Sequence, residues 1–387
     1  MGITEETGLT GLTGLTGLTG LTGLTGLTGL TTGSAVIPEA LLTNHDGIVG
    51  SPLDFEADIV PGIPNDPRNL SRLAKVRRAS LYQSQLANTV AFSFEEASNG
   101  ITATLWSLDT GPLNAPSGKD PITKKPLVRL TKPTMAQLKE QLKYVKGYAY
   151  IRPDRAAEVL TQTSLAVPFY ATIAYIDEAR TPFTLELIQT LLDFSSPIVL
   201  NMKYALAVKR PIEFSPQIQP IIPTPTHGSL PSGHSMEAFM VARLIWKLLR
   251  QSNADQYKQG GYWGEMLMRQ AHRIATNRTV AGVHFPIDSA CGAVLGLSLA
   301  DYFTGLCTSG GYTAATFVGP NYDATKDFDW HDLYDAKEDE QKEAKSEHEV
   351  WSVAKTERAE KGFKASPILS WLWDKAAAEW QDFAPTS

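Results

Sequence analysis

The chain has 387 residues, of which 43% are hydrophobic and 20% are charged, and its formal net charge is −6 at pH 7. This size allows one catalytic domain with a large core and an N-terminal extension. The negative charge and the lack of a long basic run argue against nucleic-acid binding, which needs a clustered positive face. Two cysteines, Cys291 and Cys307, are too few for a disulfide framework, and we expect Cys291 to be a small buried residue.

The first predicted segment, residues 1–43, contains eight consecutive Gly-Leu-Thr triplets from Gly8 to Thr31. The period suits a polyproline-II-like or collagen-like assembly, but the proline that stabilises such helices is missing. The tract is therefore predicted to be flexible, glycosylated on threonine, or packed into a homo-oligomer through its row of leucines. It lacks the basic and continuous apolar regions of a secretory signal, which predicts a cytoplasmic protein and leaves non-classical export open.

Residues 44–133 are predicted to form an irregular N-terminal extension rich in Pro, Asn, Asp and Gly. Within it, one helical piece is expected near Leu70–Phe94. Alternation over Ile101–Trp106 predicts a short peripheral strand. No run of about 18 uninterrupted apolar residues occurs anywhere, so we expect a soluble protein without a transmembrane segment.

Residues 134–320 are predicted to form the catalytic domain. Apolar residues recur there at three- and four-residue spacings, and Pro or Gly mark several segment ends. Antiparallel packing of such helices gives an all-α bundle. The predicted helices are Thr134–Tyr148, Arg152–Ile176, Thr184–Val208, Gly233–Gln251, Trp263–Thr276 and Ile287–Phe303.

The last segment, residues 321–387, combines a densely charged stretch with a C-terminal helix. The composition from Asp335 to Lys345 is typical of a solvated helix. The three tryptophans of Ile368–Trp380 predict a helix that docks on the body of the protein or on another subunit.

Two cations in the helical region lie seven residues apart. Lys203 and Arg210 are separated by about two helical turns, so we expect them to share one helical face before Pro211 stops the helix. Ammonium and guanidinium groups make charge-assisted hydrogen bonds to anionic oxygens. The pair is therefore a candidate anion site.

A Leu-Pro-Ser-Gly-His segment, ending at His234, is predicted to open a helix. Ser232 and the N–H of Gly233 add neutral donors at its N-terminus, where free amides and the helix dipole favour negative charge. Arg278 brings a third cation later in the chain. Together these groups are the donors that a tetrahedral oxyanion requires.

Two histidines supply the reactive groups. His284 and Asp288 are four residues apart, so the carboxylate can bond one imidazole nitrogen and fix the tautomer that leaves the other nitrogen free. One of His234 and His284 can then attack or ligate the central atom. The other can move a proton at an apical oxygen, because imidazole titrates near working pH.

These blocks resemble a known signature. The order Lys-x6-Arg-Pro, Pro-Ser-Gly-His and Arg-x5-His-x3-Asp is similar to that of type 2 phosphatidic acid phosphatases, bacterial class A acid phosphatases and vanadium-dependent haloperoxidases. The resemblance covers roughly residues 195–305, and Asn277 stands where the family usually has Ser. It implies a helical bundle of the haloperoxidase and acid phosphatase type, whose four-helix core holds phosphate or vanadate.

The resemblance also implies a role for each residue. The anion's oxygens would be bound by Lys203, Arg210, Ser232, Gly233 and Arg278. In a haloperoxidase His284 would be the ligand of vanadium and His234 the acid-base group on peroxide. In a phosphatase His284 would become phosphorylated and His234 would protonate the leaving group.

His227 discriminates between these chemistries. It resembles the extra active-site histidine of vanadium bromoperoxidases, where chloroperoxidases carry Phe. Leu200, in contrast, stands where haloperoxidases tend to have an aromatic residue. We therefore predict a vanadium-dependent haloperoxidase that oxidises bromide or iodide with hydrogen peroxide. The alternatives are a soluble acid phosphatase acting on a phosphoester, and a structural subunit whose triplet repeat builds an assembly.

Overall fold

The computed structural model describes residues 36–48, 61–97, 100–109, 123–164, 166–252, 254–258, 261–342, 350–356 and 365–381. The chain divides into two compact units, Met1–Ser80 and Leu81–Ser387. In the first unit, α2 (Val36–Ile48) and the 3-10 helix η6 (Pro67–Arg72) are described. The Gly-Leu-Thr repeat lies outside the described residues, so its predicted roles stay predictions.

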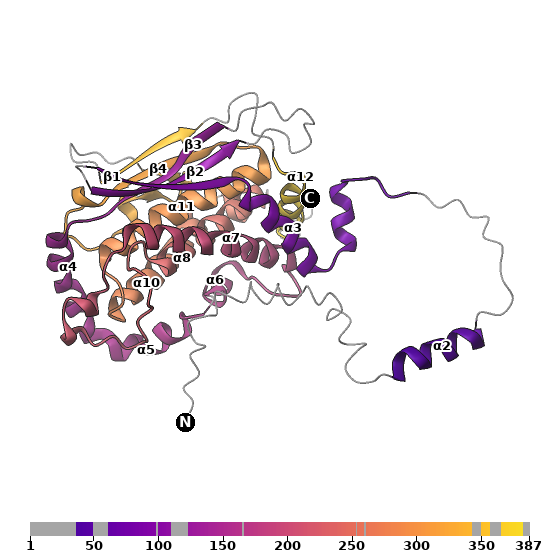
Figure 1. The fold of residues 1–387 in the computed structure, drawn as a ribbon, viewed down its shortest axis with the longest axis horizontal. Helices are drawn as coiled ribbons and strands as arrows, with labels where there is room; N and C mark the ends of the chain where they lie inside the picture. Colours follow the sequence, from indigo (N-terminus) through magenta and orange to yellow (C-terminus); the bar gives the residue numbers. More distant parts are fainter. Residues whose placement is uncertain are drawn as a thin grey trace. The chain divides into compact units, whose positions relative to one another are not determined.

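The second unit is mostly helical (Figure 1). The prediction of a mostly helical protein is therefore confirmed. Its helices are α4 (Met135–Tyr148), α5 (Arg152–Thr161), α6 (Val167–Ala174), α7 (Pro182–Leu206), α8 (Gly233–Gln251), α9 (Asp255–Lys258), α10 (Tyr262–Val280), α11 (Pro286–Thr308) and α12 (Pro367–Ala378), and α3 (Lys75–Ala87) runs across the division between the units. Short 3-10 helices are η7 (Ala149–Ile151), η8 (Pro211–Glu213), η9 (Pro216–Ile218), η10 (Gly319–Asn321) and η11 (Trp330–Asp332).

Helix α11 forms the centre of this unit and is buried along nearly its whole length. It packs against α8 on one side and against strands of a sheet on another. Two glycines permit the close approach to α8. A Cβ atom at Gly292 would lie 2.5 Å from the carbonyl oxygen of Ser232, and one at Gly296 would overlap the carbonyl oxygen of Met236. Because α8 and α11 both begin at the candidate site, this contact fixes how far apart their N-termini lie.

A five-stranded mixed sheet covers one face of the helices (Figure 1). Its order is β1-β2-β3-β4-β7, with β3 and β4 parallel and the other pairs antiparallel. The prediction of an all-α protein is therefore wrong in this respect. The strands are β1 (Val90–Ala97), β2 (Gly100–Asp109), β3 (Thr123–Thr131), β4 (Tyr312–Val318) and β7 (Trp351–Thr356), and β5 (Tyr334–Asp335) pairs with β6 (Glu340–Gln341) in a separate hairpin.

The sheet joins segments that the sequence placed in three different regions. Strands β1 to β3 come from the predicted extension, β4 from the predicted catalytic segment and β7 from the predicted C-terminal segment. The strand expected at Ile101–Trp106 is part of β2, which pairs on both edges and packs against α7. It is therefore integral to the unit and not peripheral.

Three predicted helices differ from the structure. Arg152–Ile176 is two helices, because Gln162 ends α5 outside helical geometry and Pro168 starts α6. The tract expected to be helical to Phe94 turns into β1 at Val90. The charged stretch that begins at Asp335 forms the β5–β6 hairpin, in which Asp339 has a positive φ of 60°.

Asp339 anchors that hairpin to α8 through buried charges. Its Oδ1 accepts from Nε of Arg243 at 2.9 Å, and its Oδ2 accepts from Nζ of Lys247 at 2.7 Å. Asp301 on α11 lies 3.0 Å from the same Lys247 nitrogen. A charged segment is thus held by paired side chains and not by solvation. Cys291 is buried, as predicted, and is a free thiol.

Candidate active site

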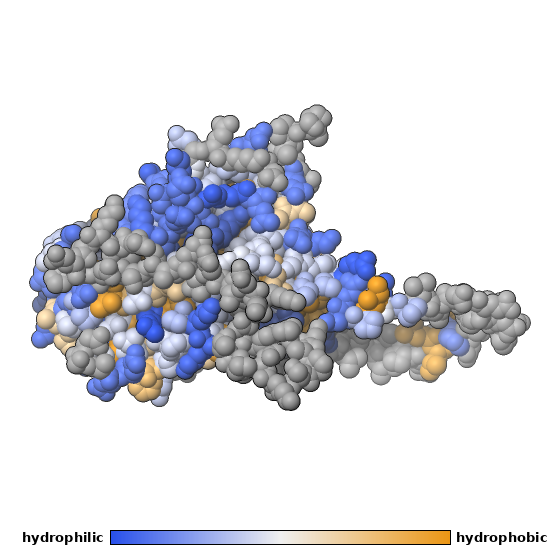
Figure 2. Space-filling model, turned by 90° about the horizontal axis from the view of Figure 1, so that it is seen from above, coloured by the Kyte–Doolittle hydropathy of each residue, from blue (hydrophilic) through white to orange (hydrophobic). Residues whose placement is uncertain are grey.

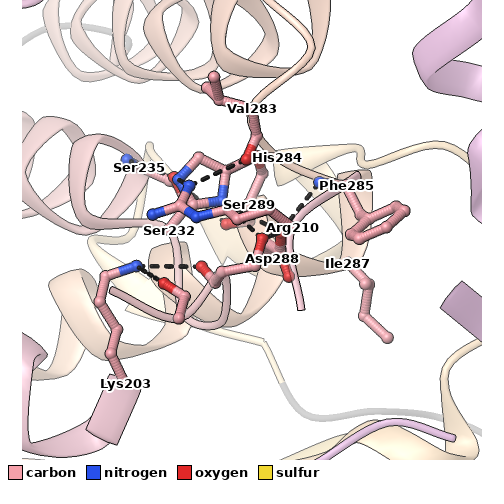
Figure 3. Close-up of polar contacts among 12 residues, drawn as sticks. Lys203, Arg210, Ser232, Ser235, Val283, His284, Phe285, Ile287, Asp288 and Ser289 are labelled. Atoms are coloured by element: carbon pink, nitrogen blue, oxygen red, sulfur yellow. Dashed lines mark hydrogen bonds and ion pairs between the residues drawn. The ribbon is translucent and has the colours of Figure 1, made fainter. Parts of the chain in front are cut away.

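His284 lies two residues before the start of α11, and Asp288 lies in the first turn of that helix. Nδ1 of His284 is 3.0 Å from Oδ2 of Asp288, and the same carboxylate oxygen accepts from the N–H of Phe285 at 2.9 Å and from the hydroxyl of Ser229. Burial raises the pKa of Asp288, and the hydrogen bonds from Ser229 and Phe285 oppose that rise. The first turn of α11 therefore holds the carboxylate of Asp288 beside the imidazole of His284 (Figure 3).

The tautomer of His284 follows from its second neighbour. Nη1 of Arg210 lies 2.9 Å from Nε2 of His284. A guanidinium can only donate, so Nε2 accepts and the ring proton sits on Nδ1, where it is donated to Asp288. Burial and then the charges of Arg210 and Lys203 lower the pKa of His284 well below its usual value. The imidazole is neutral and offers a lone pair beside Arg210.

Lys203 and Arg210 are not on one helical face, contrary to the sequence prediction. Helix α7 ends at Leu206, because Ala207 adopts a left-handed conformation with φ of 45°. Lys203 stays in the last turn, where Nζ donates to the carbonyls of Gly228 and Ser229 at 3.0 Å each.

Arg210 follows in extended conformation beyond the end of α7. Besides the contact with His284, Nη1 donates to the carbonyl of Val283 at 2.9 Å, and the backbone N–H donates to Glu213 at 2.6 Å. Burial lowers the pKa of this guanidinium to about 10, so Arg210 stays charged at neutral pH. Burial and then the charge of Arg210 lower the pKa of Lys203 well below its ordinary value. Lys203, Arg210, Ser232, the N–H of Gly233 and Arg278 are together called the cradle below.

Helix α8 begins at Gly233, as predicted, and Ser232 is its N-cap. The hydroxyl oxygen of Ser232 accepts from the N–H of Ser235 at 3.4 Å, and the backbone N–H of Ser232 donates to the carbonyl of Asp288 at 2.9 Å. This bond ties the start of α8 to the start of α11 (Figure 3). The first amides of α8 have no intrahelical acceptor and are available to an anion.

Arg278, in the last turn of α10, is fully buried and incompletely paired. Nη2 donates to the carbonyl of Val159 at 3.1 Å and approaches Oε1 of Gln162 at 3.4 Å, whereas Nε and Nη1 have no partner among the described residues. Burial lowers the pKa of Arg278 to about 10, so it stays charged. Unpaired donors on a buried cation are costly unless an anion satisfies them. A tetrahedral oxyanion such as phosphate or vanadate therefore fits the donor set.

Asn277 does not join the site. Its amide nitrogen donates to Gln162 at 2.9 Å and to Glu158 at 3.1 Å, and its oxygen accepts from Arg155 at 3.1 Å. The residue that departs from the usual Ser thus links α10 to α5. It positions its neighbour Arg278 without occupying the anion's place.

His234 lies in the first turn of α8 and lines a small cavity, here called the inner cavity, together with Gln162, Val167, Leu192 and Glu237. Burial, and then the charges of Arg278 and Lys203, lower the pKa of His234 to about 3. The ring is therefore neutral at neutral pH until an anion enters the cradle. Sequence reasoning missed Gln162, which carries no motif.

His227 lies against Arg210 on a loop. Nη2 of Arg210 is 3.0 Å from Nδ1 of His227, and the same nitrogen lies 3.2 Å from the carbonyl of Gly228. Because the guanidinium can only donate and makes the shorter contact, we assign Nδ1 as an acceptor and place the proton of the neutral ring on Nε2. Partial desolvation and then the charge of Lys203 lower the pKa of His227 to about 4. The ring borders a solvent-open hollow of about 360 Å³, here called the outer cavity, which is also lined by Ile212 and Thr224.

The predicted site residues are thus brought together from four helices and one loop. Residues 185–306, which contain all of them, match the PAP2 superfamily. This helical core belongs to the PAP2 superfamily. No curated protein matches the chain in sequence. Among solved structures, the chain is similar to one described as the first transmembrane PAP2 type phosphatidylglycerolphosphate phosphatase from Bacillus subtilis, with 20% identity, a TM-score of 0.35, and coverage of 44% of this chain and 86% of that chain.

Two helices of the PAP2 core are long and apolar enough to cross a membrane by length and composition, which the sequence analysis did not expect. These segments are Pro182–Glu213 and Pro286–Thr308, and their most apolar windows are 61% and 89% buried inside the protein. On the face shown in Figure 2, hydrophobic residues form small separate patches on a mostly hydrophilic surface. Core helices of soluble proteins pass the same test, so the predicted soluble state stays a prediction.

Proposed function

We propose that the protein is a vanadium-dependent haloperoxidase that oxidises bromide or iodide with hydrogen peroxide. The observation that favours this chemistry is the contact between His227 and Arg210. It places an uncharged imidazole, with its proton on Nε2, between a cradle cation and the solvent-open outer cavity. An N–H donor at that position suits a halide or a peroxide oxygen better than it suits any step of phosphoester hydrolysis.

The cradle residues would hold vanadate as a tetrahedral anion. Nε2 of His284 would bind the vanadium, and Lys203, Arg210, Arg278, Ser232 and the N–H of Gly233 would bind the oxygens. When bound, vanadate supplies a Lewis acid that activates hydrogen peroxide toward halide attack. The protein then has three tasks, which are orientation, neutralisation of charge and proton transfer.

His234 performs the proton transfer. Its neutral ring would accept a proton from peroxide and return one to the oxygen that leaves as water. Lys203 would donate to an oxygen of the anion and draw electron density from it. Asp288 keeps Nδ1 of His284 protonated, so that Nε2 stays a ligand throughout.

A second candidate, an acid phosphatase, is favoured by the same Nε2 of His284, which carries the lone pair of the neutral ring and accepts from Nη1 of Arg210. That nitrogen would attack phosphorus as the ester P–O bond breaks, and His234 would protonate the departing oxygen. Water would then hydrolyse the P–N bond and regenerate His284. Vanadate and phosphate share charge and shape, so the cradle accommodates either.

One paired assay separates the two chemistries. Purified protein, with and without added orthovanadate, is tested for peroxide-dependent bromination of a phenol dye and for hydrolysis of p-nitrophenyl phosphate, with His284→Ala as the blank. The proposal expects vanadate-dependent bromination that is lost in His284→Ala. Hydrolysis that vanadate inhibits, without bromination, would establish the phosphatase in its place.

A further inference from the structure

Glu237 lies one turn after His234 on α8, and both side chains line the inner cavity. Residues three apart on a helix face the same side. The other walls are mostly apolar and come from α6, α7 and α10, with Val167, Leu192 and Ile274 among them. A carboxyl group therefore sits in an apolar recess next to the proposed proton-transfer residue.

The inner cavity, about 20 Å³, has room for one water molecule. Its polar groups are those that such a water needs. Nε2 of Gln162 is buried without a hydrogen-bond partner among the described residues. Oε1 of the same amide accepts from Asn277 and Arg278, so the orientation of the amide is fixed and Nε2 is the free donor.

The carboxyl of Glu237 makes no hydrogen bond or ion pair with any described residue that would hold it ionised. Burial raises its pKa to about 7, and Lys203 on α7 opposes that rise. Tyr170 on α6 also lies near, but its hydroxyl donates to the carbonyl of Ala238 at 2.8 Å. Arg278 on α10 acts on His234, whose pKa is lowered to about 3. At neutral pH the carboxyl of Glu237 can carry a proton, whereas the imidazole of His234 is neutral when no anion is bound.

We propose that Glu237 is a positioning residue that exchanges a proton with His234 through a water held in the inner cavity by Gln162. When His234 gives its proton to a departing oxygen, the Glu237 carboxyl gives its proton to the water, and the water gives one to His234. Glu237 is left as a carboxylate and regains a proton from solvent. This inference rests on the proposed role of His234 and applies to halide oxidation and phosphoester hydrolysis alike.

Binding of inorganic sulfate, a tetrahedral dianion that does not itself titrate near neutral pH, tests the inference without turnover. Calorimetry in buffers of different ionisation enthalpy, between pH 5.5 and 8.5, counts the protons taken up on binding. The wild-type protein is expected to show a step in proton uptake near pH 7. Glu237→Gln keeps the shape of the side chain and should lose this step, with turnover about tenfold to hundredfold lower. Glu237→Asp should restore a step at a shifted pH.

Asp193→Asn is the matched control. Burial also raises the pKa of Asp193, but this residue does not line the inner cavity, so its removal should leave the step in place. An unchanged step in Glu237→Gln overturns the inference while leaving the proposed function standing. A step that vanishes in Glu237→Gln, in a protein that neither brominates nor hydrolyses, supports the inference and rejects the function. Failure of the wild-type protein to bind either sulfate or phosphate rejects both.

Discussion

Nδ1 of His284 lies 3.0 Å from Oδ2 of Asp288, and both groups are buried. The carboxylate of Asp288 therefore has two structural roles. It fixes the tautomer of the imidazole, and through Phe285 N–H it closes the first turn of α11. A change at Asp288 is expected to alter the chemistry of His284 through the orientation of its ring, without touching the anion.

Asp288→Asn should weaken the site while preserving the fold. The amide nitrogen can donate to Nδ1, which favours the tautomer with the proton on Nε2 and removes the lone pair from the cradle. We expect vanadate retention and turnover to fall about 10- to 100-fold, measured by dialysis against vanadate-free buffer and by the bromination assay. Ser229→Ala, which removes one bond to the same carboxylate, should have a smaller effect. Equal activity of Asp288→Asn and wild type would contradict the assignment.

Two buried arginines should respond to Met substitution with opposite signs. Arg278 has two nitrogens without a partner among the described residues, whereas Arg243 bonds Asp339, Gln341 and the carbonyl of Leu297. Without anion, Arg278→Met should raise the free energy of unfolding by about 1 kcal/mol, and Arg243→Met should lower it by about 3–5 kcal/mol.

Phosphate should reverse the order of stability, so that the wild-type protein becomes more stable than Arg278→Met. At a phosphate concentration 100 times Kd, the wild-type protein gains about 2.7 kcal/mol, and Arg278→Met should gain little. Urea unfolding with and without phosphate measures both effects. Destabilisation of anion-free Arg278→Met as large as that of Arg243→Met would show that Arg278 is a structural residue.

His227→Phe should separate the two candidate chemistries. Removing the imidazole takes the Nε2 donor from the outer cavity and one acceptor from Arg210. We expect kcat/KM for bromide to fall about tenfold in the bromination assay. The affinity for vanadate should change little. Thr224→Val, which lines the same cavity, is the control. Full bromination by His227→Phe would leave this residue without a role in halide oxidation.

Stability should fall on acidification below pH 6.5. The pKa values of His234, His227 and His284 are lowered in the folded protein, to about 3, to about 4 and well below 6.5 respectively. The unfolded chain therefore binds protons that the folded chain does not, and stability that is complete above pH 6.5 is lost as the pH falls toward the folded values. Buried His284 is expected to contribute to this loss, because burial and the charges of Arg210 and Lys203 hold its folded pKa well below the ordinary value.

Denaturant unfolding at pH 7.5 and pH 5.0, without phosphate or vanadate, checks this sign. Glu237 acts in the opposite direction, because its raised pKa favours the folded state below about pH 4.5 and withdraws that contribution as the pH rises to about 7. Glu237→Gln should therefore steepen the loss of stability between pH 7 and pH 5. His284→Asn should reduce it.

The sequence predicted the parts of the site that depend on short-range spacing. Ser232 caps α8 and Asp288 reaches His284, because each relation spans at most four residues of regular helix. The end of α7 at Ala207 could not be predicted in this way, since the residues around it are ordinary helix formers. Lys203 and Arg210 converge because the chain leaves the helix between them.

Contacts between distant parts of the chain could not be predicted from local sequence patterns either. Parallel pairing of Val128 with Ala315 joins distant strands, and no local pattern encodes it. Gln162 belongs to no motif, and its place beside Arg278 depends on how α5 packs on α10. The sequence did identify Asn277 as a departure from the usual Ser. Its bonds to α5 give that departure a structural meaning.

Gly292 and Gly296 on α11 also affect the candidate active site. They carry no catalytic atom, yet the absence of their side chains lets the backbone of α11 touch that of α8. His234 projects from one of these helices and His284 precedes the other. A single methyl group at Gly296 would force α8 and α11 apart. His234 and His284 would then lie too far apart to act together on the small anion proposed to bind between them.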